Sequence, residues 1–138
     1  MPKYVTEQSL RGESAVAKLI EERRDVSLEK LNPVYRLDYA AFRKGEVTSF
    51  IEIKCRTFER DKYETTLINA HKIMSANDIA QAFGRPAFLV VSWTDWTGFI
   101  PFAGLGQFRI GMGGRTDRGD PKDWDICCFI PVSEFKEL

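Results

Sequence analysis

The amino-acid sequence predicts one α/β domain that spans residues 1–138. Three features lead to this prediction. The chain has 138 residues, 43% of them hydrophobic, which is enough for one core and too few to divide comfortably into two. Two segments show the apolar spacing of helices. Others carry the β-branched and aromatic residues of strands. Together these features indicate a mixture of helices and strands around one core.

The first half of the chain is expected to form a helix followed by a β-hairpin. Between residues 12 and 24, apolar side chains recur at spacings of one, three and four, with charged residues between them, as in an amphipathic helix. Asn32-Pro33 then ends helical structure, because proline disfavours helical geometry in the residue before it. Residues 34–55 have strand-forming side chains on both sides of a polar turn at 43–46, which predicts a hairpin.

The second half is expected to contain a helix and two further strands. Residues 65–83 have apolar side chains at helical spacings, and Gly-Arg-Pro at 84–86 supplies a stop. The apolar run 87–93 is typical of a central strand covered on both faces. Residues 98–122 contain seven glycines and four Lys or Arg, which suits loops or a basic hairpin tip. Residues 125–135 predict an apolar strand followed by a turn or short helix.

Composition restricts the classes of function. Lys plus Arg number 20 and Asp plus Glu number 20, so the net charge gives no long-range attraction to DNA. This balance weighs against a nucleic-acid role unless acids form a metal site while bases line a groove. The three cysteines lack a metal-binding spacing and are expected to be reduced thiols. Without a long apolar segment or a secretory signal, we expect no membrane association and a cytoplasmic location.

The predicted hairpin carries a group of charged side chains. Glu52 and Lys54 are two residues apart on the second arm and so project to the same face. A turn at 43–46 places Asp38 opposite Ile51, one residue from Glu52, and a twist or a bulge in the hairpin could bring the two carboxylates together. Clustered carboxylates are costly unless a cation compensates them. The pattern therefore suggests a divalent metal site.

Mg²⁺ is the cation that suits this donor set. It prefers carboxylate and carbonyl oxygens, with its remaining positions open to water and phosphate. Asp38 and Glu52 could supply the carboxylates, and the backbone carbonyl of Ile53 a third oxygen. Lys54 would then be placed to hold or deprotonate the attacking water and to stabilise charge on a phosphate.

These residues resemble the signature of a known family. Asp38, followed after thirteen residues by Glu52-Ile53-Lys54, is similar to the signature of the PD-(D/E)XK phosphodiesterases. The sequence GESAVA at 12–17 resembles the G-E-x-x-V-A opening of some members, and Glu13 matches their helix-borne glutamate. Leu37 stands where the signature has proline, a change that the family tolerates.

The resemblance implies a fold and an activity. The fold would be restriction-endonuclease-like, an αβββαβ core with a mixed central sheet flanked by helices. The activity would be that of a DNA endonuclease dependent on Mg²⁺ or Mn²⁺, with Asp38 and Glu52 as ligands, Lys54 as the catalytic lysine and Glu13 assisting. A Holliday-junction-resolvase-like preference for DNA structure and a homodimer are expected by analogy, as is an origin in a bacterial, archaeal or phage-infected cell.

Less specific interpretations exist for each of these residues. Asp38, Glu52 and Lys54 could form a solvated cross-strand charge cluster, which contributes only roughly 0.2–1 kcal/mol. Glu13 could be a first-turn acid favoured by the helix dipole. A non-catalytic module that binds nucleic acid or protein on the same fold is the alternative function.

Three basic residues outside the signature are candidates for contact with nucleic acid. Lys72 lies on the second predicted helix, and Arg109 and Arg115 lie in the glycine-rich segment. A solvated position on a helix face is equally compatible with Lys72, whereas Arg109 and Arg115 would contact the DNA backbone from a basic hairpin tip. The single histidine, His71, excludes a mechanism that needs two imidazoles and is expected at a helix surface.

Overall fold

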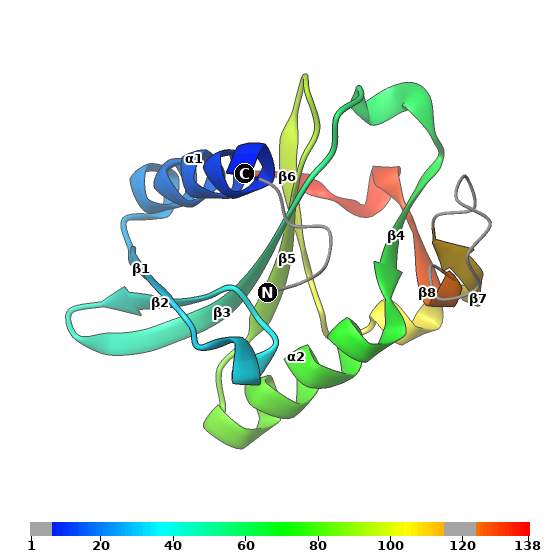
Figure 1. Ribbon diagram of the computed structural model, residues 1–138. Coiled ribbons are helices and arrows are strands. Elements are labelled where there is room, and N and C mark those ends of the chain that lie inside the picture. The colour runs from blue at the N-terminus through cyan, green and yellow to red at the C-terminus, as the bar shows by residue number, and fades with distance from the viewer. Residues whose placement is uncertain (1–6, 115–123) are drawn as a thin grey trace.

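The computed structural model describes residues 7–114 and 124–138 (Figure 1). Its two α-helices are α1 (Glu7–Arg24) and α2 (Ala70–Phe83). The strands are β1 (Ser27–Lys30), β2 (Tyr39–Arg43), β3 (Glu46–Cys55), β4 (Thr65–Asn69), β5 (Ala87–Ser92), β6 (Thr97–Pro101), β7 (Arg109–Gly114), β8 (Trp124–Pro131) and β9 (Lys136–Glu137). Neither helix is long and apolar enough, over these residues, to cross a membrane.

The larger sheet is mixed, as expected. Its six strands lie in the order β1-β2-β3-β5-β6-β9. Strands β1, β2 and β3 pair antiparallel, β5 pairs parallel to β3, and β6 and β9 continue antiparallel. Taking this sheet with its two helices, the chain order is α1-β1-β2-β3-α2-β5. The predicted αβββαβ core is therefore confirmed.

The two helices cover opposite faces of this sheet (Figure 1). Successive side chains of a strand point to opposite faces, so β3 contributes to both layers. Ile51 and Ile53 pack in the cluster that contains the apolar side of α1. Phe50 packs in the cluster that contains Ile73 of α2. The same alternation places Glu52 and Lys54 on the α2 side of the sheet.

A second sheet, with strand order β4-β8-β7, accounts for one error of the sequence prediction. Residues 65–69, predicted as the start of a helix, form β4 and pair with β8 from Thr65 opposite Pro131 to Asn69 opposite Cys127. Pairing with a distant strand overrides the local apolar spacing. Helix α2 begins only at Ala70, where the Asn69 side chain accepts a hydrogen bond from the backbone of His71.

Two further expectations about the first half of the chain were wrong. The first arm of the hairpin begins at Tyr39, because Pro33–Tyr35 form a 3₁₀ turn and Arg36 adopts a left-handed backbone conformation with φ of 60°. The third strand of the core, β1, lies between α1 and the hairpin, where the sequence analysis expected no strand. It is four residues long and mostly exposed, so its sequence carries little signal.

The described part of the glycine-rich segment, residues 98–114, is not mainly loop. It contains β6 and β7, whereas residues 115–122 lie outside the described residues. Gly98 lies in β6. A glycine is needed there because a Cβ atom would come within 2.2 Å of the Trp96 ring and 2.9 Å of the Lys136 carbonyl oxygen. At this position the glycine allows close packing within the sheet and does not form a turn.

Candidate functional site

A β-bulge in the hairpin determines where Asp38 lies. Phe42 is opposite Val47 but Ala41 is opposite Ser49, so β3 contains one extra residue. Tyr39 therefore faces Ile51, and Asp38, the preceding residue, comes level with Glu52 instead of Ile51. The bulge that the sequence analysis considered is present and brings the two acids to the same level of the sheet.

Asp38 is fixed against the backbone of β3. Its Oδ2 accepts a hydrogen bond of 2.8 Å from the backbone N–H of Ile53. The N–H and C=O of one strand residue point to the same edge of the strand. Strand β2 pairs with β3 only as far as Ile51, so the Ile53 carbonyl faces the same gap as Asp38. One carboxylate and one backbone carbonyl thus meet beyond the end of β2.

Glu52 is a buried carboxylate. Its side chain is 3% exposed, and Oε2 lies 3.4 Å from the ammonium groups of both Lys54 and Lys72. Its Oε1 is buried and has no hydrogen-bond partner among the described residues. Burial, followed by the negative charge of Asp38, raises the pKa of Glu52 to about 7. An additional cation beside Glu52 would therefore stabilise its charged form.

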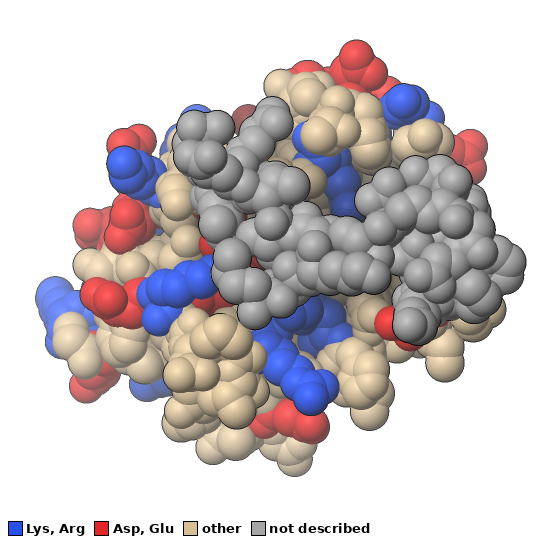
Figure 2. Space-filling model, viewed as in Figure 1, with Lys and Arg blue, Asp and Glu red and all other residues tan. Residues whose placement is uncertain are grey.

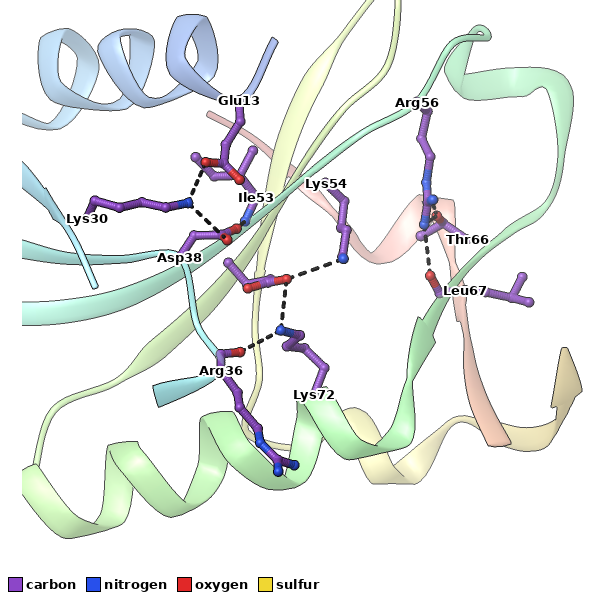
Figure 3. Close-up of polar contacts among 11 residues, drawn as sticks. Glu13, Lys30, Arg36, Asp38, Ile53, Lys54, Arg56, Thr66, Leu67 and Lys72 are labelled. Atoms are coloured by element: carbon purple, nitrogen blue, oxygen red, sulfur yellow. Dashed lines mark hydrogen bonds and ion pairs between the residues drawn. The ribbon is translucent and has the colours of Figure 1, made fainter. Parts of the chain in front are cut away.

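Lys72 approaches Glu52 from α2 (Figure 3). Its ammonium also donates to the backbone carbonyl of Arg36, in the segment before β2. The sequence analysis proposed Lys72 only as a contact to nucleic acid, whereas the structure places it among the acids. Its distance in sequence from the hairpin gave no signal of this contact.

Glu13 belongs to a separate group on the α1 side (Figure 3). Its Oε2 accepts hydrogen bonds from Lys30 at 2.7 Å and from the Tyr39 hydroxyl at 3.2 Å. Lys30 also lies 3.6 Å from Oδ1 of Asp38. Sequence reasoning missed Lys30 because β1 was not recognised as a strand, and it missed Tyr39 because the hydroxyl contact depends on how α1 packs on the sheet.

Titration properties reflect these contacts. Partial burial opposes the charged form of Lys30, but the hydrogen bond to Glu13 and the charge of Asp38 raise its pKa overall. Burial, and then the charge of Glu13, raises the pKa of Tyr39 to about 12. At neutral pH the Lys30 ammonium and the Tyr39 hydroxyl both keep their protons.

The donor set fits a divalent cation at Asp38 and Glu52. Mg²⁺ is commonly held by one or two carboxylates, with further oxygens from carbonyls and water. The Oε1 of Glu52, which has no hydrogen-bond partner in the described part of the chain, and the Ile53 carbonyl meet this requirement. Within the described residues, no three acidic, histidine or cysteine side chains converge as a ready ligand set. Glu13 is thus not positioned together with the other two acids.

An open groove of about 480 Å³ adjoins the site. Its lining residues are Pro33, Arg36, Lys54, Asn69, His71, Lys72 and Ser75. In Figure 2, Lys and Arg side chains gather near the centre of the face above α2. Three basic residues in this lining provide local positive charge in a molecule with no net charge.

Arg109, another predicted basic contact, is not brought to the site. Arg109 packs its guanidinium over the ring of Phe129, 4.0 Å from the ring centroid, on the smaller sheet. Arg115 lies outside the described residues.

The fold and site together define the class of protein. An αβββαβ core that places Asp38 level with Glu52, two residues before Lys54, has the arrangement that the resemblance to the PD-(D/E)XK phosphodiesterases implied. A family model described as "Phage putative PDDEXK endonuclease" matches residues 1–138, and the chain belongs to this family. The nuclease class that the sequence resemblance implied is therefore confirmed.

Two solved structures have a similar fold. One is Hjc, a Holliday junction resolvase from the archaeal hyperthermophile Archaeoglobus fulgidus, with a TM-score of 0.64 and 15% identity over 96% of this chain and 93% of that chain. The other is D212, a nuclease from a fusselovirus, with a TM-score of 0.53 and 15% identity over 95% of this chain and 82% of that chain. No curated protein matches the sequence. At this identity the two structures establish the fold.

Proposed function

We propose that the protein hydrolyses phosphodiester bonds in DNA with Mg²⁺ or Mn²⁺ held by Asp38, Glu52 and the Ile53 carbonyl. The observation that carries this proposal is the buried Glu52, whose Oε1 has no hydrogen-bond partner among the described residues and which lies beside a second carboxylate. A bound divalent cation would compensate both charges and would supply the Lewis acidity that activates water and polarises a phosphate.

Lys54 is proposed as the catalytic lysine. Its side chain is 41% exposed and lines the groove, while its ammonium stays 3.4 Å from Glu52. From this position it can orient a water molecule toward a phosphate in the groove and stabilise the negative charge that develops there. Glu13 would assist indirectly, by holding Lys30 and Tyr39 beside Asp38.

The proposed substrate is DNA with a branched structure. Arg36, Lys54 and Lys72 line the groove beside the acids, and cations in such a position can contact backbone phosphates without reading sequence. The structural likeness to a Holliday junction resolvase favours a four-way junction as the first substrate to test. Because a junction needs two cuts, we also propose that the chain acts as a homodimer, with residues 1–138 as one domain.

One observation favours the alternative of a non-catalytic binding module. Each of the three carboxylates already has a lysine partner: Glu13 and Asp38 contact Lys30, and Glu52 contacts Lys54 and Lys72. Three ammonium groups balance three carboxylates, so the folded site tolerates the absence of a metal. The same residues would then bind phosphates without cutting them.

A cleavage assay separates the two functions. Labelled linear duplex, single-stranded, flap and four-way-junction DNAs are incubated with Mg²⁺, Mn²⁺ or EDTA, and wild type is compared with Lys54→Ala. Lys136→Ala, an exposed lysine on β9, is the matched control. We expect metal-dependent cutting, fastest on the junction, that is lost only in Lys54→Ala. A folded wild type that cuts none of these DNAs, and that gains no thermal stability with metal, would leave the binding module as the function.

A further inference from the structure

Lys30 occupies the space between two acids of the site. Its ammonium lies 2.7 Å from Oε2 of Glu13 and 3.6 Å from Oδ1 of Asp38. It also lies 4.9 Å from the centroid of the Tyr39 ring, whose hydroxyl donates to the same Glu13 oxygen. One positive charge therefore bridges a carboxylate from α1 and a carboxylate from the segment before β2.

Because Lys30 bridges Glu13 and Asp38, the two oxygens of Asp38 face different acids. Asp38 turns Oδ2 toward the Ile53 backbone, on the side of Glu52, and Oδ1 toward Lys30, on the side of Glu13. On the first side, the ammonium groups of Lys54 and Lys72 both contact Oε2 of Glu52, whereas its Oε1 has no hydrogen-bond partner among the described residues. On the second side, the ammonium of Lys30 already contacts both carboxylates, at Oε2 of Glu13 and at Oδ1 of Asp38. A divalent ion can thus enter between Asp38 and Glu52, whereas an ion between Asp38 and Glu13 would meet the ammonium of Lys30.

Lys30 is held by its contacts and not by burial. Its side chain is 54% exposed and comes from β1, at the edge of the larger sheet. Replacing the ammonium by an uncharged group of similar length would leave the strand backbone unchanged. It would also leave Glu13 and Asp38 facing each other without a compensating charge, which is the situation that favours a hard cation.

We propose that Lys30 takes the place of a second metal ion and limits each chain to one divalent cation. This inference rests on the proposed function, because it presumes a first ion at Asp38 and Glu52. In this arrangement Glu13 is not a ligand in the wild-type protein. It is a positioning residue that holds Lys30, and through Lys30 the Oδ1 of Asp38.

The test is a count of bound Mn²⁺ by isothermal titration calorimetry on the full chain in the absence of DNA. We expect one ion per chain for wild type and two for Lys30→Met, with a return to one in the double variant Lys30→Met, Glu13→Gln. Lys30→Arg keeps the charge and should bind one ion. Lys136→Met removes a lysine from the edge strand at the other end of the same sheet and should also bind one.

The outcomes distinguish this inference from the proposed function. If wild type binds one Mn²⁺ and folded Lys30→Met also binds one, Lys30 does not exclude a second ion and the inference is wrong. If wild type binds none, the metal site of the proposed function fails first. Circular dichroism in EDTA verifies folding, and Lys30→Gln replaces Lys30→Met if the methionine variant does not fold.

Discussion

At the scale of single residues, the site is governed by the cost of burying Glu52. A buried carboxylate loses solvation that its neighbours must replace, and Lys54 and Lys72 replace only part of it on Oε2. The remaining cost raises the pKa of Glu52. Burial is the larger cause of this shift, and the negative charge of Asp38 is the next. This cost has consequences that can be measured without DNA.

The metal-free protein should lose stability as pH rises from about 4.5 to about 7. The pKa of Glu52 is raised from 4.5 to about 7, so within this range the folded state retains a proton that the unfolded state has released. Below the range both states are protonated and the cost is absent. Above it the cost is complete, on the order of 3 kcal/mol in the free energy of unfolding.

Urea denaturation in EDTA at several pH values, with wild type and Glu52→Gln, measures this effect. We expect the free energy of unfolding of the variant to exceed that of wild type by an amount that grows with pH up to about 7. If the free energies of unfolding of the two proteins changed in parallel with pH, Glu52 would not titrate in this range.

Substitutions of Lys54 and Asp38 should distinguish the loss of catalysis from the loss of metal binding. Lys54→Ala removes a charge that touches substrate in the proposed mechanism, and we expect a loss of roughly 10²–10³ in the single-turnover rate. It should retain the rise in melting temperature caused by Mn²⁺, because both carboxylates and the Ile53 carbonyl remain. Asp38→Asn should lose both properties. If Lys54→Ala also lost the metal-induced stabilisation, its role would be in assembling the site.

At the scale of elements, Arg56 joins the two sheets immediately after β3. Its guanidinium donates to Thr66 Oγ1 at 3.1 Å and to the Leu67 carbonyl at 2.8 Å, both in β4 (Figure 3). Burial lowers its pKa, so the charge is stabilised mainly by these acceptors. The link holds the end of β3 against the smaller sheet.

We expect Arg56→Met to lower the free energy of unfolding by about 1–3 kcal/mol, because it removes hydrogen bonds between a charged donor and buried acceptors. Thr66→Val removes only one acceptor and should cost less. Urea denaturation with both variants gives the comparison. Equal stability of Arg56→Met and wild type would mean that the two sheets do not depend on this link.

Elements with strong local patterns could be predicted, and those defined by distant partners could not. The hairpin and β5 have strand-forming residues around a polar turn or in one apolar run, and both were predicted. Strand β1 was missed because only four residues, mostly exposed, form it. Strand β4 was mistaken for helix because β8, its partner, lies about sixty residues away in sequence.

The same distinction applies to the site. Asp38, Glu52 and Lys54 share one hairpin, so periodicity and a family signature were sufficient to bring them together. Lys30 and Lys72 reach the acids from an edge strand and from α2. No spacing in the sequence encodes those contacts, because they depend on how the helix and the strand pack on the sheet.

At the scale of the whole molecule, the described residues of one chain provide one carboxylate pair at the proposed metal site, Asp38 and Glu52, with a groove beside it. Two cuts in a junction therefore require two chains or two encounters. We expect light scattering after size exclusion to give twice the mass of one chain at concentrations where junction cutting is complete. A monomer that still makes paired cuts would contradict the proposed dimer.

The unequal lengths of β2 and β3 have one more consequence. Past Ile51, no strand of the described residues pairs with the edge of β3 that faces β2, and the amide of Ile53 is held there by the carboxylate of Asp38. That amide is a natural reporter in nuclear magnetic resonance. Its chemical shift and its rate of exchange with deuterium follow the state of a single side chain, so the filling of the site can be observed in real time from one backbone proton, without substrate and without turnover.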